Sequence, residues 1–273
     1  TAMTVLGTPY RLGATSYVWP DEILPNVRQL APLVDDVELV LFEVDGYSNL
    51  PDAATVDELI ALAESHDLTY TVHLPLDLTL AHPQSLAEAE KVIACTRDLA
   101  PWAYVLHLDG RRPVVGGTGS LEGDPSPTTV IRWQEDACQV LEKLAVLADG
   151  AQRLCVENLE NYAPEHFLPL LERVPVGLCV DAGHLWLTGR DALSFLDRYL
   201  ARTRVVHLHG IDAGASQPTD HQSLRHLGAE GVAPVLDLLS ARGYDGVLTL
   251  EVFGREDFFS SRSLVAEMVD GKP

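Results

Sequence analysis

RLCVENLE at residues 153–160 and VGLCVDAGHL at 176–185 decide the fold. Each contains a short apolar run that ends in a carboxylate, Glu157 in the first and Asp181 in the second, just before a loop. Runs of this kind are typical of buried parallel strands. The same pattern recurs along the chain, where the polar residues that end the runs are Glu43, His73, His107, His207 and Glu251. The C-terminal ends of barrel strands share one face, so we expect all seven side chains to meet there.

Apolar runs alternate with longer amphipathic stretches over most of the chain. We expect strands near 11–16, 37–43, 69–74, 103–108, 153–158, 176–181, 204–209 and 247–252, and helices near 21–34, 52–66, 85–99, 128–149, 163–173, 190–202, 231–242 and 256–269. Asp52 and Ser85 are the expected N-caps of two of these helices. Eight strand–helix units of about 30 residues predict a single (β/α)8 TIM barrel.

An open doubly wound sheet is the alternative architecture. It requires a glycine-rich turn after the first strand, which GATSYVWP at 13–20 does not supply. No change in composition divides the chain. We therefore expect residues 1–10 to form a flexible N-terminal arm and residues 11–273 to form the catalytic barrel.

The charge of the chain restricts its partners. It has 19 Lys and Arg against 40 Asp and Glu, a formal net charge of −21. A surface this acidic repels phosphate backbones and anionic lipids, so we expect no nucleic-acid or membrane partner. The four cysteines form no CxxC pair, and neither a membrane-spanning run nor a signal-peptide pattern is found. These features favour a cytoplasmic protein with reduced thiols, and they do not indicate an oligomeric state.

The polar residues at the strand ends form a set of metal ligands. Glu157, Asp181, His207 and Glu251 supply three carboxylates and one imidazole, which suit Mn²⁺, Mg²⁺ or Zn²⁺. Burying several unpaired carboxylates without a cation is costly, which favours a metal site over a packing role.

Further histidines extend this set. His73 and His107 would lie on adjacent strands and, with Glu157 as a bridge, hold a second ion. His184 and His221 could bind a third ion or contact the substrate. His209 would either alternate away from the partners of His207 or line the pocket, and His66, His82, His166 and His226 are expected on the surface.

The motifs in chain order resemble a known superfamily. VHLP, VLHLDG, VENLE, VDAGHL, VVHLHG and TLEVF are similar to the xylose isomerase-like TIM barrels, which include endonuclease IV-type (AP endonuclease family 2) enzymes and sugar epimerases. The resemblance implies the same four core ligands, a second ion at His73 and His107, and a third at His184 and His221. Endonuclease-type chains carry a ligand aspartate two positions before the loop histidine. Here that place is Thr219, with Asp220 adjacent, so a third ion does not follow from the motif.

The front segment resembles one bacterial branch of this superfamily. TSYVWPDEILPNVRQLAPLVDDVELVLFE, residues 15–43, is similar to the opening of the cobamide-remodelling phosphodiesterases. This resemblance implies hydrolysis of a phosphoester in the nucleotide loop of a cobamide, a B12-type cofactor.

The leading hypothesis is therefore a metal-dependent phosphodiesterase that uses two or three Zn²⁺ or Mn²⁺ ions. Metal ions would activate water for attack on phosphorus. The catalytic candidates are Glu157, Glu251 and Glu43. The expected substrate contacts are Tyr17, Trp19, Arg111, Arg112, Trp186 and His209.

Two other function classes compete with this hypothesis. A sugar or sugar phosphate isomerase or epimerase would use the four core ligands, with Glu157 and Glu251 transferring a proton. It needs one ion, so His73 and His107 separate it from the hydrolase. A binding module without catalysis would leave the barrel mouth free of metal even when Mn²⁺ or Zn²⁺ is supplied.

Overall fold

The computed structural model describes residues 4–44, 46–111, 120–214 and 218–271, in which eight parallel strands close into a barrel. Its strand order is β1-β12-β9-β8-β7-β6-β5-β2, with each strand hydrogen-bonded to its neighbours. The strands are β1 (Arg11–Thr15), β2 (Asp36–Val40), β5 (Thr69–His73), β6 (Ala103–Leu106), β7 (Leu154–Glu157), β8 (Gly177–Asp181), β9 (Thr203–Leu208) and β12 (Val247–Leu250). The predicted single (β/α)8 barrel is confirmed.

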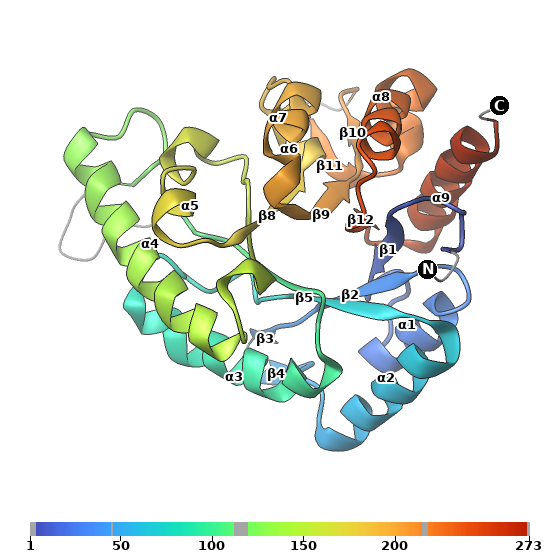
Figure 1. Cartoon of the computed structure of the whole chain (residues 1–273), viewed down its shortest axis with the longest axis horizontal. Helices are drawn as coiled ribbons and strands as arrows, with labels where there is room; N and C mark the ends of the chain where they lie inside the picture. Colours follow the sequence, from blue (N-terminus) through green and yellow to red (C-terminus); the bar gives the residue numbers. More distant parts are fainter. Residues whose placement is uncertain (1–3, 45, 112–119, 215–217, 272–273) are drawn as a thin grey trace.

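Helices surround the barrel (Figure 1). They are α1 (Ile23–Leu30), α2 (Ala53–His66), α3 (Leu86–Thr96), α4 (Pro127–Leu147), α5 (Leu170–Arg173), α6 (Ala182–Leu187), α7 (Ala192–Tyr199), α8 (Gly228–Ala241) and α9 (Arg255–Asp270). Most match the predicted stretches, but α6 is not foreseen and α5 is only the end of the predicted 163–173. Among the described residues, no helix is both long and apolar enough to cross a membrane.

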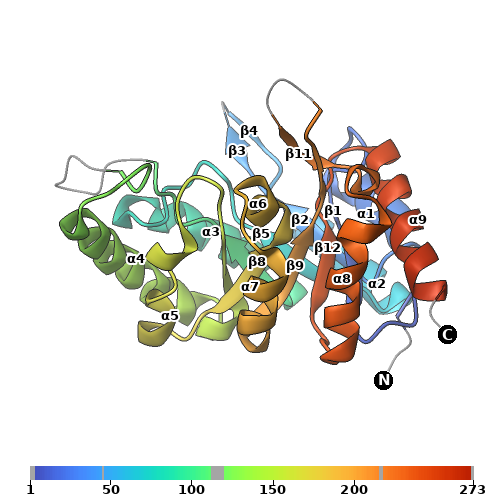
Figure 2. The same cartoon turned by 90° about the horizontal axis from the view of Figure 1, so that it is seen from above.

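Two hairpins extend the loops at the C-terminal end of the barrel. They are β3 (Glu43–Val44) with β4 (Tyr47–Ser48), and β10 (Gly210–Asp212) with β11 (Thr219–Gln222). Figure 2 shows β3, β4 and β11 rising from the same end of the molecule. The predicted strand 37–43 is too long, since β2 ends at Val40 and Glu43 begins a hairpin.

Local signals explain where two helices begin. The side chain of Asp52 accepts a hydrogen bond from the backbone N–H of Thr55, as predicted for an N-cap of α2. Ser85 precedes α3, but its hydroxyl accepts from the N–H of Thr79 and caps no helical amide. The Ser85 cap is therefore a wrong prediction.

Side chains alternate along each strand between the helix-facing and the inward-facing side. On β6, Tyr104 and Leu106 belong to the large core cluster between strands and helices. Ala103 and Val105 belong to a small separate cluster with Cys155, Cys179 and Val205. Because successive strand residues point to opposite faces, this second cluster fills the barrel interior. Two residues further along each strand from Val105, Cys155, Cys179 and Val205, the next inward positions are His107, Glu157, Asp181 and His207.

The chain is anchored before the first strand. The backbone N–H of Val5 donates to Asp35 over 2.8 Å, and Tyr10 is fully buried. The predicted N-terminal arm is therefore held against the barrel at Val5 and Tyr10, and the hydrophobic core begins at Tyr10.

Candidate metal centre

Four predicted ligands converge at the C-terminal end of the barrel. Glu157 ends β7, Asp181 ends β8, His207 lies near the end of β9 and Glu251 follows β12. Their ligand atoms all lie within 4.8 Å of one another, and all four residues are buried. We call them the four-ligand cluster. The strand register brings these residues together. His207 on β9 is paired with Asp181 on β8 at one side and with Thr249 on β12, two residues before Glu251, at the other.

Three atoms of this cluster are buried without a hydrogen-bond partner within the described part of the chain. They are Glu157 Oε1, His207 Nδ1 and Glu251 Oε2. His207 Nδ1 lies 3.1 Å from Glu251 Oε2 and 3.7 Å from Glu157 Oε1. Unsatisfied buried polar groups are expensive, and three that point to one place match the requirement of a cation. The residues therefore fit a divalent metal ion.

A second group shares Glu157. Its other oxygen, Oε2, lies 3.2 Å from His73 Nε2 and 3.0 Å from His107 Nε2. Nδ1 of His73 lies 2.8 Å from the carbonyl oxygen of Leu74 and donates a hydrogen bond to it, which leaves Nε2 of the neutral ring free to ligate. Glu157 thus divides its two oxygens between two sets of ligands, as a bridging carboxylate does. We call His73 and His107 the histidine pair.

The carboxylates and histidines of the centre control each other's protonation. Burial opposes ionisation of Glu157, yet the charges of His107 and His207 hold its pKa well below the ordinary value. Burial also opposes protonation of His73, but the Glu157 hydrogen bond and the nearby carboxylates outweigh it and raise the pKa of His73 to about 9. Protonated histidines and divalent ions are thus alternative sources of the positive charge that these carboxylates require.

The third predicted pair lies beside the cluster. His184 Nδ1 contacts the carbonyl of Asn158 over 3.1 Å, and His221 Nδ1 contacts the carbonyl of Glu251 over 3.2 Å. Each carbonyl accepts a hydrogen bond from Nδ1–H, so Nε2 of each neutral ring is free. Asp220 Oδ2 lies 4.0 Å from His184 Nε2 and 3.9 Å from His221 Nε2. Asp220 therefore stands near both histidines although it is displaced by one position from the family motif.

His209 supports Asp181. Its Nδ1 accepts a hydrogen bond from the backbone N–H of His221 over 3.0 Å, which is shorter than the 3.3 Å from Nδ1 to the carbonyl of Gly210. The proton of the neutral ring therefore belongs on Nε2, which lies 3.2 Å from Asp181 Oδ1. The side-chain amide of Asn158 donates a hydrogen bond to the backbone carbonyl of Asp181 and accepts one from its backbone N–H, each over 2.9 Å. Both ring nitrogens of His209 are engaged, so it is better suited to orienting Asp181 than to ligating an ion itself, although its ring lies close to His184 and His221.

Residues 34–270 match the model of one protein family, the xylose isomerase-like TIM barrels. The chain belongs to this family.

Solved structures with the same fold cover nearly the whole chain. A D-tagatose 3-epimerase-like protein is 18% identical with a TM-score of 0.74, covering 95% of this chain and 97% of its own. The probable 3-DHS dehydratase AsbF of Bacillus anthracis, involved in petrobactin synthesis, is 13% identical with a TM-score of 0.70, covering 96% and 100%. D-psicose 3-epimerase of Clostridium cellulolyticum H10 is 14% identical with a TM-score of 0.64, covering 95% and 94%. At these identities the likeness concerns the fold. No curated protein matches the chain.

In this xylose isomerase-like barrel Glu43 lies apart from the four-ligand cluster. It is exposed on the β3–β4 hairpin, and both its oxygens accept from Lys91 over 2.6 and 2.7 Å. Since β2 ends at Val40, the buried carboxylate of this strand that lies nearest the four-ligand cluster is Glu38, which contacts His207. The prediction that Glu43 joins the other strand-end residues is wrong.

The predicted substrate contacts are dispersed. Tyr17 contacts Phe42, with ring centroids 5.9 Å apart, on the loops after β1 and β2. Trp19 packs edge-on against Phe259 of α9, so it faces the helix layer. Trp186 of α6 is half-buried against the core. Arg111 bonds Asp109 over 3.2 Å, and Arg112 lies outside the described residues, as does most of the glycine-rich loop beside it.

The sequence prediction missed Glu38 in the barrel interior and gave His209 a different role. Glu38 is fully buried and contacts His207, and His209 contacts Asp181 rather than only lining a pocket. Strand alternation is the signal for both, because each lies an even number of positions from an inward residue. The expectation that His82 lies on the surface is also wrong: it is 6% exposed, and its Nε2 has no partner among the described residues.

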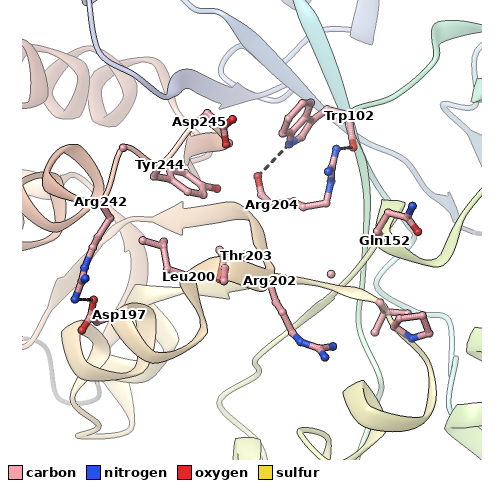
Figure 3. A pocket seen from close by; sticks show the side chains of 16 residues that line it. Trp102, Gln152, Asp197, Leu200, Arg202, Thr203, Arg204, Arg242, Tyr244 and Asp245 are labelled. Carbon is pink, nitrogen blue, oxygen red and sulfur yellow. Dashed lines mark hydrogen bonds and ion pairs between the residues drawn. The ribbon is translucent and has the colours of Figure 1, made fainter.

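A cavity of about 780 Å³ lies at the opposite end of the barrel. It is lined by residues where strands begin, such as Gly177, Thr203 and Gly246. Figure 3 shows Arg242 directed at Asp197 and Arg204 against Trp102, with Arg202 pointing away from both. These arginines diverge, so they do not build an anion site.

Proposed function

We propose that the chain is a divalent-metal-dependent hydrolase that cleaves a phosphoester of a small metabolite. The observation that carries the proposal is the position of Glu157 between the four-ligand cluster and the histidine pair. Two-ion phosphoester hydrolases hold their ions about 4 Å apart. An enzyme that works with one ion does not need the histidine pair.

Ions held by these residues would lower the pKa of water and stabilise charge on the phosphoryl oxygens. Glu157 would give one oxygen to each ion. Glu251 is 6% exposed, and its Oε2 faces His207. Its other oxygen is then available to accept a proton from the attacking water. Asp181, held by Asn158 and His209, would complete the first ion's ligands.

The rim of the barrel supports a substrate with a large apolar surface. Tyr17, Phe42 and Tyr47 form a row of rings with centroids 5.9 and 5.7 Å apart. Leu76 and Phe253, on the loops after β5 and β12, are exposed at the same end. Binding sites commonly combine apolar walls with a few placed polar groups. We propose the nucleotide loop of a cobamide as the substrate, in keeping with the resemblance of residues 15–43.

The second candidate is a sugar isomerase or epimerase. Several of the solved structures with this fold carry that activity in their names, among them L-ribulose 3-epimerase and D-psicose 3-epimerase. The comparisons favour this candidate over the hydrolase, whereas the histidine pair favours the hydrolase. In an epimerase, Glu157 and Glu251 would transfer a proton at a carbon beside a carbonyl.

Metal counting combined with two assays tests the proposal. The purified protein is stripped with a chelator, reloaded with Zn²⁺ or Mn²⁺, and analysed for bound metal. It is then incubated with adenosylated cobamides and, separately, with ketoses. Two or three ions per chain with release of a ribazole phosphate are expected. One ion per chain with an epimerised ketose would replace the hydrolase by the second candidate, and absence of bound metal would exclude both.

A further inference from the structure

Glu38 contacts His207 across the interior of the barrel. Glu38 lies on β2 and is fully buried. Its Oε2 is 2.9 Å from Nε2 of His207 on β9. In the strand order, β1 and β12 separate these two strands. The contact therefore depends on closure of the barrel and joins residues 169 positions apart.

The two nitrogens of His207 face different partners. Nε2 faces the carboxylate of Glu38, and Nδ1 faces the four-ligand cluster, 3.1 Å from Glu251 Oε2 and 3.9 Å from Asp181 Oδ2. Nδ1 is buried and has no hydrogen-bond partner within the residues described. One side of the ring is thus committed to a hydrogen bond, while the other is open toward the ligands.

This arrangement decides which nitrogen can bind an ion. A neutral imidazole carries one proton, and an ionised carboxylate can only accept a hydrogen bond. With Glu38 as acceptor, the proton stays on Nε2 and the lone pair of Nδ1 points at the cluster. The ring cannot turn over without placing a lone pair against the buried carboxylate. Glu38 also adds a negative charge behind the ligand, which strengthens it as a donor.

We propose that Glu38 is the positioning residue of the metal centre: it fixes the proton of His207 on Nε2 and so presents Nδ1 to the ion held by Glu157, Asp181 and Glu251. The inference rests on the proposed metal binding and does not depend on which reaction the centre catalyses. Partners that orient a ligating histidine typically change metal affinity about 10–100-fold when they are removed.

Three variants on the full chain separate this role from a packing role. Glu38→Leu removes the acceptor, and Glu38→Gln keeps an amide oxygen that can accept from Nε2–H. Asp36→Asn is the matched control, because Asp36 is a fully buried carboxylate on the same strand whose partner is Thr69. Circular dichroism and thermal melting establish that each variant is folded.

Binding of Co²⁺ alone is followed by titration calorimetry and by the visible absorption of the bound ion. The wild type and Asp36→Asn should bind with the same dissociation constant. Glu38→Leu should bind about 10–100-fold more weakly with an altered spectrum, and Glu38→Gln should restore most of both. If Glu38→Leu keeps the wild-type affinity and spectrum, the positioning role is wrong and the metal centre stands. A wild type that binds no Co²⁺, Zn²⁺ or Mn²⁺ would remove the metal centre itself, and the inference with it.

A second measurement covers the case in which Glu38→Leu does not fold. In ¹⁵N spectra of the Zn²⁺-loaded protein, His207 should show a protonated Nε2 and a ligating Nδ1. Glu38→Gln should shift the Nε2–H resonance, since the acceptor becomes neutral. An unchanged resonance would show that Glu38 does not hold this proton.

Discussion

Glu157 and His107 meet through a 3.0 Å contact between Oε2 and Nε2, which uses only one oxygen of the carboxylate. The other oxygen, Oε1, is buried on the side of His207. Removing the charge of Glu157 should therefore disturb both sets of ligands. We expect Glu157→Gln to lower activity more than about 100-fold with little loss of stability, because this residue serves the site rather than the core. Initial rates and a thermal melt test this, with Glu165→Gln at an exposed carboxylate that is ion-paired with Arg190 as control. An unchanged rate would disprove the bridging role.

His107→Asn should separate the two candidate functions. The substitution removes the imidazole of His107, and with it the Nε2 that faces Glu157, and it changes no residue of the four-ligand cluster. For a two-ion hydrolase, elemental analysis should show the loss of about one ion per chain and phosphoester cleavage should fall sharply. For a one-ion epimerase, metal content and ketose turnover would stay at the wild-type level. The control is His166→Asn, a half-buried histidine outside the ligand groups.

Metal affinity should rise with pH between about 6.5 and 9. Burial opposes protonation of both His73 and His184, but the neighbouring carboxylates outweigh it and raise both pKa values to about 9. An ion must displace these protons. Calorimetry in two buffers of different ionisation enthalpy should detect proton release at pH 7.5, and the release should become smaller as the pH rises past about 9. Equal heats in both buffers at pH 7.5 would show that no proton leaves.

The metal-free protein should become less stable as the pH rises from about 6.5 to 9, whereas its metal affinity increases. A histidine whose pKa is raised by folding stabilises the fold fully below its unfolded pKa, about 6.5, and this contribution is lost as pH passes the folded value of about 9. The melting temperature in chelator should therefore fall over this interval, more than it does for His73→Asn. If the melting temperatures of the wild type and His73→Asn fall equally with pH, groups other than His73 cause the loss of stability.

Asp36→Asn should make the protein more stable above neutral pH. Burial raises the pKa of Asp36 from 3.8 to about 7 despite a hydrogen bond from Thr69. Keeping this side chain buried costs no stability below pH 3.8, where it is protonated in both the folded and the unfolded protein. The cost grows as the pH rises toward 7, because the unfolded chain ionises first, and it reaches up to about 4 kcal/mol. Chemical denaturation at pH 5 and pH 8 should show a larger gain at pH 8. The exposed Asp57→Asn is the control and should show no such difference.

Gly183→Ala should damage the metal centre through His209. A Cβ at Gly183 would lie 2.1 Å from the His209 ring, far inside contact distance. Alanine normally favours a helix over glycine by about 1 kcal/mol, so a loss here must come from the clash. We expect weaker Co²⁺ binding, because displaced His209 no longer orients Asp181. Gly254→Ala is the control, with its nearest neighbour at 3.6 Å, and should bind normally. Equal binding by both variants would contradict the support of Asp181 by His209.

The sequence alone determined the barrel and the positions of most candidate ligands. Buried parallel strands leave an unbroken apolar run, and the first polar residue after it falls at the barrel mouth, so Glu157, Asp181 and His107 were identifiable without coordinates. It failed at Glu43 because the end of β2 has no sharp signal, as the apolar run continues past Val40 into a loop.

Contacts across the barrel were decided only by the tertiary structure. Alternation along a strand is local and tells which side chains point inward. Which inward side chains face each other depends on strand order and stagger, which the closed sheet sets as a whole. That is why the contact of Glu38 with His207 across the barrel, and that of His209 with Asp181 on the adjacent strand, emerge only from the fold. The path of the loop after β1 is likewise set by the tertiary structure: Tyr17, two residues after the strand, contacts Phe42, whereas Trp19, four residues after it, packs against Phe259 of α9.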